Sequence, residues 1–420
     1  MYISRLEISN LRSIEHAVLE LNRPRSRKLR CPNVNVLLGD NGSGKTTVLR
    51  AAALAALAPV LGQSSGFVPD GLMRRLPQLA TEHGAKPRLR IRKRITKGTA
   101  IARVRLDHQD LIRSPKQILL EAEIHRIADS ERVEWIRRKR PFERRIERAQ
   151  YGTKTSAFFL VGYGASRRVE LSERIDESAR LKSRMRRYER VAGLFEEHVA
   201  LVPLSYWLPD YERRNPGRHK EVVNLMNRLL PAACRMQLKA SETATGRENL
   251  FDINGVSVPF RALSDGYRAY VGWIGDMLFH LCMGSPSGRK LVQNRGVVLV
   301  DEIDLHLHPD WQRIVVPTLA KELPNIQFIV TTHSPLVVGS LQAENLFVLA
   351  MEERCSIVRR LPEPVHGMSA EQILLSPYFG LETTRSPEVA DNLRKLVVKA
   401  QKGDAKASVR YLKLLAGGKV

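Results

Sequence analysis

The chain has few cysteines, no long hydrophobic run and too few acidic residues to balance its basic ones. Its four cysteines, at positions 31, 234, 282 and 355, lie far apart without C-x-x-C spacing. This usage argues against a zinc knuckle or a disulfide framework and suits the reducing cytoplasm. No apolar run approaches the roughly 20 residues that cross a bilayer, and the N-terminus lacks a signal-peptide core. We therefore expect a cytoplasmic protein without a membrane partner.

Acidic side chains are in deficit, because 44 Asp and Glu face 68 Lys and Arg, which gives the 420 residues a formal net charge of +24. Such an excess predicts a polyanionic partner, either nucleic acid or an anionic membrane surface. Residues 86–154 hold 21 Lys or Arg against 9 Asp or Glu. About half of the excess therefore lies in one segment.

Two arginine clusters in this segment are candidates for phosphate contact. In the first, arginines alternate with apolar residues on both sides of a turn predicted at Lys97-Gly98-Thr99, which predicts a hairpin with one basic face. The second surrounds residues 137–140. A solvated surface is the alternative, but such a surface intersperses charges of both signs. We therefore favour phosphate contacts with nucleic acid, without strong sequence preference. The candidates are Arg88, Arg90, Arg92, Arg103, Arg105, Arg137, Arg138 and Arg140.

The most informative motif is GDNGSGKTT at residues 39–47, which follows an apolar run and precedes a helix-forming stretch. It satisfies G-x-x-x-x-G-K-[ST], in which glycines let the backbone wrap a triphosphate and the following helix presents its positive end. Lys45 is expected to reach the β and γ phosphates, and the Thr46 hydroxyl to ligate Mg²⁺. The chain is thus predicted to bind ATP and Mg²⁺. The predicted contacts are Gly39, Asp40, Asn41, Gly42, Ser43, Gly44, Lys45, Thr46 and Thr47.

A second group of motifs lies in residues 296–335. The apolar run 297–300 ends in Asp301-Glu302, and a second apolar run, 326–330, ends in TTHS. A helix-length segment separates them, which predicts a strand, helix, strand unit of a parallel sheet. Asp301 is expected to hold the Mg²⁺ water shell, and Glu302 to orient or deprotonate the attacking water. Two acids can simply end a strand, but the phosphate loop favours catalysis.

Other segments give coarser expectations. Residues 2–21 alternate as a strand pair, the helix after the phosphate loop is expected to end near Leu57, and residues 170–230 have mostly helical spacing. In the tail, Ser369 and Gln372 have capping-box spacing, and a second helix is predicted around Val389–Lys399.

Three motifs together resemble one group of ATPases: LSDGYR at 263–268, DEIDLHLHP at 301–309 and TTHSP at 331–335. They are similar to the ABC-type ATPases of the RecF, SMC and OLD group, above all to stand-alone AAA-like ATPases of bacterial anti-phage systems of the Septu and retron type. The resemblance implies an α/β P-loop NTPase fold of ABC type. That fold has a mixed or parallel central sheet, an N-terminal antiparallel β subdomain and a helical insertion.

The resemblance also implies roles for particular residues. In such proteins two subunits sandwich ATP, so a homodimer or a higher even oligomer is expected. Ser264, Asp265 and Gly266 would complete the partner's site, and His333 would sense the γ-phosphate, although a histidine after a strand can also cap or pack. Asp304 would lie in the loop that joins the two sites. Arg12 would approach the nucleotide.

The chain departs from transporter ATPases in two ways. Its signature has Asp265 and Tyr267 where transporters usually have Gly and Gln, and no glutamine loop is visible; residues 158–168 end a strand at the corresponding place. Arg167 or Arg168 would there contact the nucleotide or its water, or belong to the basic surface. His306 and His308 suggest a metal pair, but without a third ligand we favour packing.

Four segments are expected. Residues 1–165 would form the first part of the ATPase core with the phosphate loop and a basic β-rich segment, and 166–230 a helical arm or lid. Residues 231–350 would form the rest of the core, with the LSDGYR signature, Asp301, Glu302 and His333. Residues 351–420 would form a strand and a helical tail.

These observations predict an ATP-hydrolysing switch that dimerises around ATP, binds nucleic acid and controls a separate effector in anti-phage defence. Because residues 350–420 show no D-x-D or H-N-H nuclease pattern, we expect a nuclease to be supplied by another chain. Three alternatives stay open: a RecF-like repair ATPase, a transporter motor, and a scaffold that binds ATP with little turnover.

Overall fold

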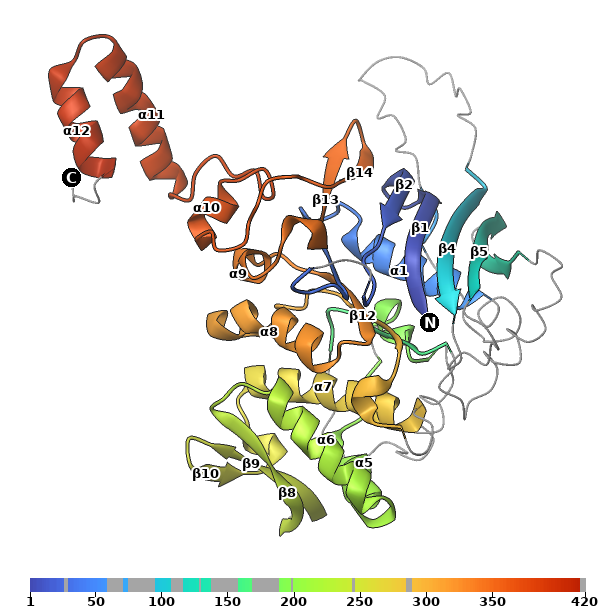
Figure 1. Cartoon of the computed structure of the whole chain (residues 1–420). Helices are drawn as coiled ribbons and strands as arrows, with labels where there is room; N and C mark the ends of the chain where they lie inside the picture. Colours follow the sequence, from blue (N-terminus) through green and yellow to red (C-terminus); the bar gives the residue numbers. More distant parts are fainter. Residues whose placement is uncertain are drawn as a thin grey trace. The chain divides into compact units, whose positions relative to one another are not determined.

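The computed structural model of the chain describes residues 1–25, 29–58, 71–74, 95–106, 116–127, 130–136, 158–167, 189–197, 199–243, 246–284 and 289–415. Two compact units form, Met1–Gly367 and Met368–Val420. Figure 1 shows the course of the chain through them. No helix among these residues is long and apolar enough to span a membrane.

A six-stranded sheet forms the centre of the first unit. Its strands are β3 (Val34–Gly39), β7 (Leu160–Tyr163), β11 (Gly296–Val300), β12 (Ile326–Thr331), β13 (Leu346–Glu352) and β14 (Cys355–Arg359). Their order is β14-β13-β3-β12-β11-β7, and all neighbours are parallel except the β13–β14 hairpin. Strands β11 and β12 are buried along their whole length, as expected for a sheet covered on both faces. The predicted parallel unit is confirmed.

An antiparallel sheet forms a second layer, which confirms the predicted N-terminal β subdomain. Its strands are β1 (Tyr2–Leu11), β2 (Ile14–Glu20), β4 (Lys97–Leu106), β5 (Lys116–Ile127) and β6 (Ser130–Trp135). Their order is β2-β1-β4-β5-β6. The expected strand pair of residues 2–21 is β1 with β2.

The turn predicted at Lys97-Gly98-Thr99 is wrong. These residues begin β4 and pair with His125, Ile124 and Glu123 of β5. Gly98 permits a close approach of chains instead of a turn, because a Cβ atom there would lie 2.8 Å from the Leu11 side chain and 2.9 Å from the Asn10 carbonyl oxygen. A glycine between polar residues is the usual mark of a turn, but here the neighbouring strand needs the space.

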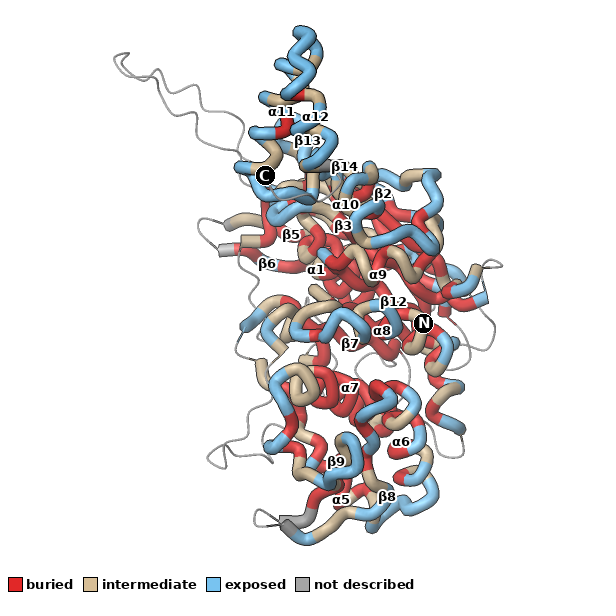
Figure 2. Tube along the Cα trace, turned by 90° about the vertical axis from the view of Figure 1, so that its left-hand side faces the viewer, coloured by how far each residue is buried: buried red, intermediate tan, exposed pale blue. Residues whose placement is uncertain are grey.

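Helix α1 (Lys45–Ala56) contacts both sheets. Its residues 51–56, Ala-Ala-Ala-Leu-Ala-Ala, are fully buried, and they belong to one apolar core with residues of both sheets. A helix that is apolar all round must be buried, and small side chains let the sheets approach it closely. Figure 2 shows buried residues concentrated in this region. The predicted helix end is confirmed, since Leu57 is the C-cap residue.

The first unit contains five further α-helices among the described residues, two before and three after residues 234–258. The helices are α5 (Leu204–Arg214), α6 (Pro216–Leu229), α7 (Asp265–Gly284), α8 (Pro309–Glu322) and α9 (Pro335–Gly339), with single 3₁₀ turns at Ala192–Leu194, Phe260–Ala262, Leu291–Gln293 and Ala343–Asn345. Helices α5 and α6 fall in the predicted helical stretch, of which residues 168–188 lie outside the described part. Helix α7 begins at the signature motif and is almost entirely buried beyond its first turn (Figure 2).

A three-stranded antiparallel sheet that was not predicted precedes α7. Its strands are β8 (Cys234–Thr243), β9 (Gly246–Ile253) and β10 (Val256–Val258), in the order β10-β9-β8. Figure 1 shows it beside α5 and α6, which contact β9 and β8 respectively.

The second unit contains α10 (Ala370–Leu374), α11 (Pro387–Gln401) and α12 (Ala405–Leu415). The predicted capping box is confirmed: the Gln372 amide donates to Ser369 Oγ at 3.2 Å, and the Ser369 amide donates to Gln372 Oε1 at 2.8 Å. The predicted second helix corresponds to α11. Helix α12 was not predicted and forms a helical hairpin with α11.

Candidate nucleotide-binding and hydrolysis site

The phosphate loop joins β3 to α1 and depends on glycines with positive φ angles. Gly39 has φ of 141°, and a Cβ atom there would lie 2.1 Å from the Leu349 carbonyl oxygen of β13. Gly44, the N-cap of α1, has φ of 95°. Such angles favour glycine because other residues meet steric conflict. Residues 40–42 are exposed, whereas Ser43, Lys45 and Thr47 are buried. The loop thus presents one open side for a ligand.

Lys45 lies within this loop. Its Nζ atom donates to the carbonyl oxygens of Gly39 at 2.7 Å and Asp40 at 2.9 Å. Burial lowers the pKa of the Lys45 ammonium group, against the opposing effect of the nearby carboxylates, first among them Asp301 and Glu302. The lysine charge is therefore close to both acids.

Thr46 and Asp301 meet at the carboxyl edge of the central sheet. Thr46 Oγ1 donates to Asp301 Oδ2 at 2.7 Å, although α1 and β11 belong to parts of the chain 255 residues apart. The other carboxylate oxygen of Asp301, Oδ1, accepts from Thr331 Oγ1 at 2.6 Å. A hydroxyl and a carboxylate are oxygen ligands of the kind that Mg²⁺ prefers. The two residues therefore fit the predicted magnesium role.

Glu302 follows Asp301 in an unusual backbone conformation. Its φ is 48°, in the left-handed region, which costs a non-glycine residue roughly 1–2 kcal/mol. Its amide donates to Thr331 Oγ1 at 2.7 Å. The side chain is partly exposed, and its carboxylate forms no hydrogen bond with another described residue. It is thus free to act on a water molecule.

Arg167 forms part of this site. Its guanidinium group donates to the carbonyl oxygens of Asp301 at 2.9 Å and Glu302 at 2.7 Å. Burial lowers its pKa to about 10, so it remains a cation at neutral pH. These bonds differ from both sequence-based alternatives, since Arg167 contacts the backbone of the acids. Arg168 lies outside the described residues.

The signature residue Gly266 packs against the loop that follows β11. A Cβ atom at Gly266 would lie 2.9 Å from the His306 carbonyl oxygen. Ser264 and Asp265 are exposed at the start of α7, where the Ser264 carbonyl accepts from the Arg268 amide at 2.8 Å. Asp304, in the same loop as His306, accepts a hydrogen bond from Thr332 Oγ1.

The histidines near the site have different surroundings. His333 is exposed after β12 and forms no hydrogen bond with another described residue, so neither capping nor packing accounts for it. His308 Nδ1 accepts from the Asp310 amide at 3.4 Å and caps α8. The described residues contain no group of three potential metal-ligating side chains. His306 and His308 are both exposed, so the packing favoured from the sequence is wrong.

Arg12 lies in the turn between β1 and β2, which borders the phosphate loop. The next residue, Ser13, has its hydroxyl 3.0 Å from where a Cβ of Gly44 would be. The Arg12 side chain donates through Nε to the Gly71 carbonyl at 2.8 Å. Burial, and then the charge of Arg12, lower the pKa of Arg50 on α1 to about 10. The structure therefore places Arg12 beside the loop, and its contact with nucleotide stays a prediction.

Of the nucleic-acid candidates, the structure describes Arg103 and Arg105. Both are exposed on β4 and alternate with buried apolar residues, as predicted. The same face of the sheet carries Glu7 and Glu121, which both pair with Ile101. The charges are thus interspersed on this face, as on an ordinary solvated surface. The candidates outside the described residues are Arg88, Arg90, Arg92, Arg137, Arg138 and Arg140.

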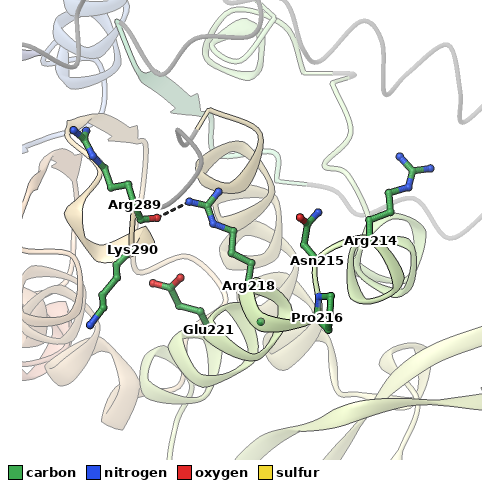
Figure 3. Close-up of a pocket in the computed structure, with 8 residues that line it drawn as sticks. Arg214, Asn215, Pro216, Arg218, Glu221, Arg289 and Lys290 are labelled. Atoms are coloured by element: carbon green, nitrogen blue, oxygen red, sulfur yellow. Dashed lines mark hydrogen bonds between the residues drawn. The ribbon is translucent and has the colours of Figure 1, made fainter.

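A separate hollow of about 520 Å³ lies where α5 meets α6 (Figure 3). Arg218 donates to the Arg289 carbonyl, and Glu221 accepts from the Leu291 amide at 2.6 Å. These bonds tie α6 to the segment that leads into β11. The hollow is lined by Arg214, Asn215, Pro216, Gly217, Arg218, Glu221, Arg289 and Lys290.

The chain is similar to known proteins of one family. A family model described as "AAA domain, putative AbiEii toxin, Type IV TA system" matches residues 34–339, from β3 past His333. The chain belongs to this family. The predicted resemblance to retron and Septu ATPases is also confirmed by individual relatives, and the P-loop ATPase fold of this family implies nucleotide use.

Two relatives and one solved structure illustrate the similarity. The retron Ec83 probable ATPase of Escherichia coli is 32% identical over 44% of this chain and 33% of its own length. The Septu protein PtuA of Bacillus mycoides is 25% identical over 91% of this chain and 45% of its own length. The chain therefore spans less than half the length of these relatives. An SMC head bound to the C-winged helix domain of ScpA aligns over 86% of this chain and 98% of its own, with 15% identity and a TM-score of 0.49.

Thr331 belongs to the TTHSP motif, and no role was predicted for it. Its hydroxyl lies between Asp301 and Glu302, and it is fully buried. The signal was present: a threonine that ends a strand next to the strand bearing the acids points its hydroxyl toward them when the strands are parallel.

Proposed function

We propose that the chain is an ATP-hydrolysing switch whose active sites are completed when two subunits enclose two ATP molecules. Support comes from where its functional groups lie. Thr46, Asp301 and Glu302 gather at one edge of the central sheet, whereas Ser264 and Asp265 are exposed at the start of a different helix. A second subunit related by twofold symmetry would bring each group opposite the other.

Each residue would have a defined task in hydrolysis. Lys45 would exchange its two loop carbonyls for phosphate oxygens, and the amides of residues 39–44 would surround the phosphates. Thr46 and Asp301 would hold Mg²⁺, which neutralises developing phosphate charge when bound. Glu302, whose carboxylate forms no hydrogen bond with another described residue, would orient the attacking water. The partner's Ser264 would contact the γ-phosphate with the free amides of its helix end.

A mixing experiment tests the split site. Lys45→Ala disables the phosphate loop, and Ser264→Arg blocks the exposed signature; each variant alone should lack activity. In an equimolar mixture, half of randomly formed dimers would be mixed, and each would contain one intact composite site. Activity should therefore return to about a quarter of the wild-type rate.

The matched control mixes Lys45→Ala with a chain that carries both substitutions, because this pair contains no intact site. Restored activity in the first mixture and none in the control is the expected result. If the first mixture stays inactive although mixed dimers are isolated by two different affinity tags, both halves of the site belong to the same chain and the proposal fails.

We further propose that the switch controls a separate effector chain, a nuclease, in anti-phage defence. The retron and Septu names of the relatives support this role. Affinity purification from the native host, followed by mass spectrometry, tests it. Retention of a nuclease is expected, and recovery of DNA repair proteins alone would favour the repair alternative.

Nucleic acid is proposed as a further ligand. Support comes from the net charge of +24 and its concentration in residues 86–154. Because the described face that bears Arg103 and Arg105 intersperses acids with its arginines, we assign the contact to the remaining candidates. Binding of DNA and RNA at a series of salt concentrations tests this assignment.

A further inference from the structure

The backbone of the two acids is fixed from several sides. The Asp301 amide donates to the Tyr163 carbonyl at 2.8 Å, and the Glu302 amide donates to Thr331. One guanidinium group, that of Arg167, binds the carbonyl oxygens of both Asp301 and Glu302. A planar group with donors in a fixed fork orients two acceptors together, which a lysine ammonium group does less well.

This arrangement matters because Glu302 has a left-handed φ of 48°. Surrounding contacts must hold a residue in such a conformation, since the relaxed chain favours negative φ. Rotation of the backbone would redirect the carboxylate, and misplacement by about 1 Å is enough to reduce catalysis strongly. The bond from Arg167 to the Glu302 carbonyl therefore bears on the direction of the catalytic group.

Helix α7, which begins at the signature motif, contacts Arg167 in turn. Its guanidinium carbon lies 6.0 Å from the ring centre of Trp273 on α7. On β7, the strand that leads to Arg167, the Tyr163 hydroxyl donates to Asp276 Oδ2 at 2.8 Å. Asp276 is fully buried on α7, and its other oxygen accepts from the Val202 amide at 2.8 Å. Tyr163 and Arg167 thus both contact α7, the helix that begins at Asp265.

We propose that Arg167 is a positioning residue for ATP hydrolysis: it holds the backbone of Asp301 and Glu302 against α7 and so directs the Glu302 carboxylate. The inference rests on the proposed hydrolytic function. Arg167 acts through Glu302, so its loss should reduce the chemical step and leave nucleotide binding almost unchanged.

The test compares Arg167→Met, Arg167→Lys and a control, Arg213→Met, whose arginine is exposed on α5. Single-turnover hydrolysis measures the chemical step, and a fluorescent ATP analogue measures affinity. Arg167→Met should lower the hydrolysis rate at least ~10-fold while Kd changes less than ~3-fold, because only the positioning of a general base is lost. Arg167→Lys keeps the charge but has fewer donors, so its hydrolysis rate should lie between that of the wild type and a ~10-fold loss. This variant keeps the inference testable if Arg167→Met folds poorly. Arg213→Met should match the wild type.

A double-variant cycle with Glu302→Gln separates positioning from general damage. If Arg167 acts through Glu302, Arg167→Met should slow the Glu302→Gln protein less than ~2-fold further. If the two substitutions together lower the hydrolysis rate by the product of their separate factors, the inference is overturned. Hydrolysis at the wild-type rate in Arg167→Met would overturn it as well. If Glu302→Gln alone hydrolyses ATP normally, the proposed function fails instead.

Discussion

Thr331→Val removes one hydroxyl from the centre of the site and keeps the shape of the side chain. The hydroxyl donates to Asp301 Oδ1 at 2.6 Å and accepts from the Glu302 amide at 2.7 Å. Thr331 is fully buried in β12. Valine also suits a strand, so the loss of these two hydrogen bonds dominates the effect.

The size of the effect follows from the two bonds. A hydrogen bond to a charged group contributes about 1.5–3 kcal/mol, and a buried amide left without a partner costs about 1–3 kcal/mol. Because Asp301 still accepts from Thr46, we expect the free energy of unfolding to fall by about 2–4 kcal/mol. Hydrolysis should also slow, since the Glu302 amide loses the bond that fixes its backbone.

Urea unfolding followed by circular dichroism measures the stability, and steady-state ATP hydrolysis measures the activity. Thr99→Val in β4 is the matched control, because Thr99 is a partly exposed strand residue far from the acids in sequence; its stability should change by less than about 0.5 kcal/mol. If Thr331→Val is as stable and as active as Thr99→Val, the hydroxyl does not hold the two acids in place.

Three more predictions follow from particular contacts. Gly39→Ala should destabilise the protein severely, because its Cβ atom would lie 2.1 Å from a carbonyl oxygen, whereas Gly42→Ala, which has no atom within 4 Å, should cost only about 1 kcal/mol; thermal unfolding of both variants checks this difference. Thr46→Ala should raise the Mg²⁺ concentration needed for half-maximal hydrolysis, and an unchanged magnesium titration would remove Thr46 from the metal site. Glutamate at the three arginines of residues 137–140 should weaken nucleic-acid binding and its salt dependence, whereas glutamate at Arg103 and Arg105 should have little effect; equal losses in the two variants would contradict the assignment.

Features encoded in continuous motifs were predictable from the sequence. The spacing of Gly39, Gly44 and Lys45 predicted the phosphate loop, because backbone conformation and charge are local requirements. The apolar runs before Asp301 and Thr331 predicted adjacent parallel strands, and the structure pairs β11 with β12. Local patterns therefore gave the core of the fold and the carboxyl edge of its sheet.

Features that depend on distant packing were not predictable. Gly98 looked like a turn residue, since only the fold brings Leu11 and Asn10 close to it. Arg167 lay in a basic sequence context, yet its partners are two carbonyl oxygens more than 130 residues away. Backbone acceptors leave no mark in the sequence, so this contact needed the structure.

Light scattering of Glu302→Gln with ATP and Mg²⁺, together with its hydrolysis rate, tests the ATP-enclosing dimer most directly. The wild type and Glu388→Gln, an exposed residue in the first turn of α11, are the controls. Bound ATP, accumulated dimers and a collapsed hydrolysis rate are expected for Glu302→Gln alone, because the sites close but do not turn over. Hydrolysis at the wild-type rate, or a monomer at saturating ATP, would contradict a switch that closes on ATP and reopens through Glu302.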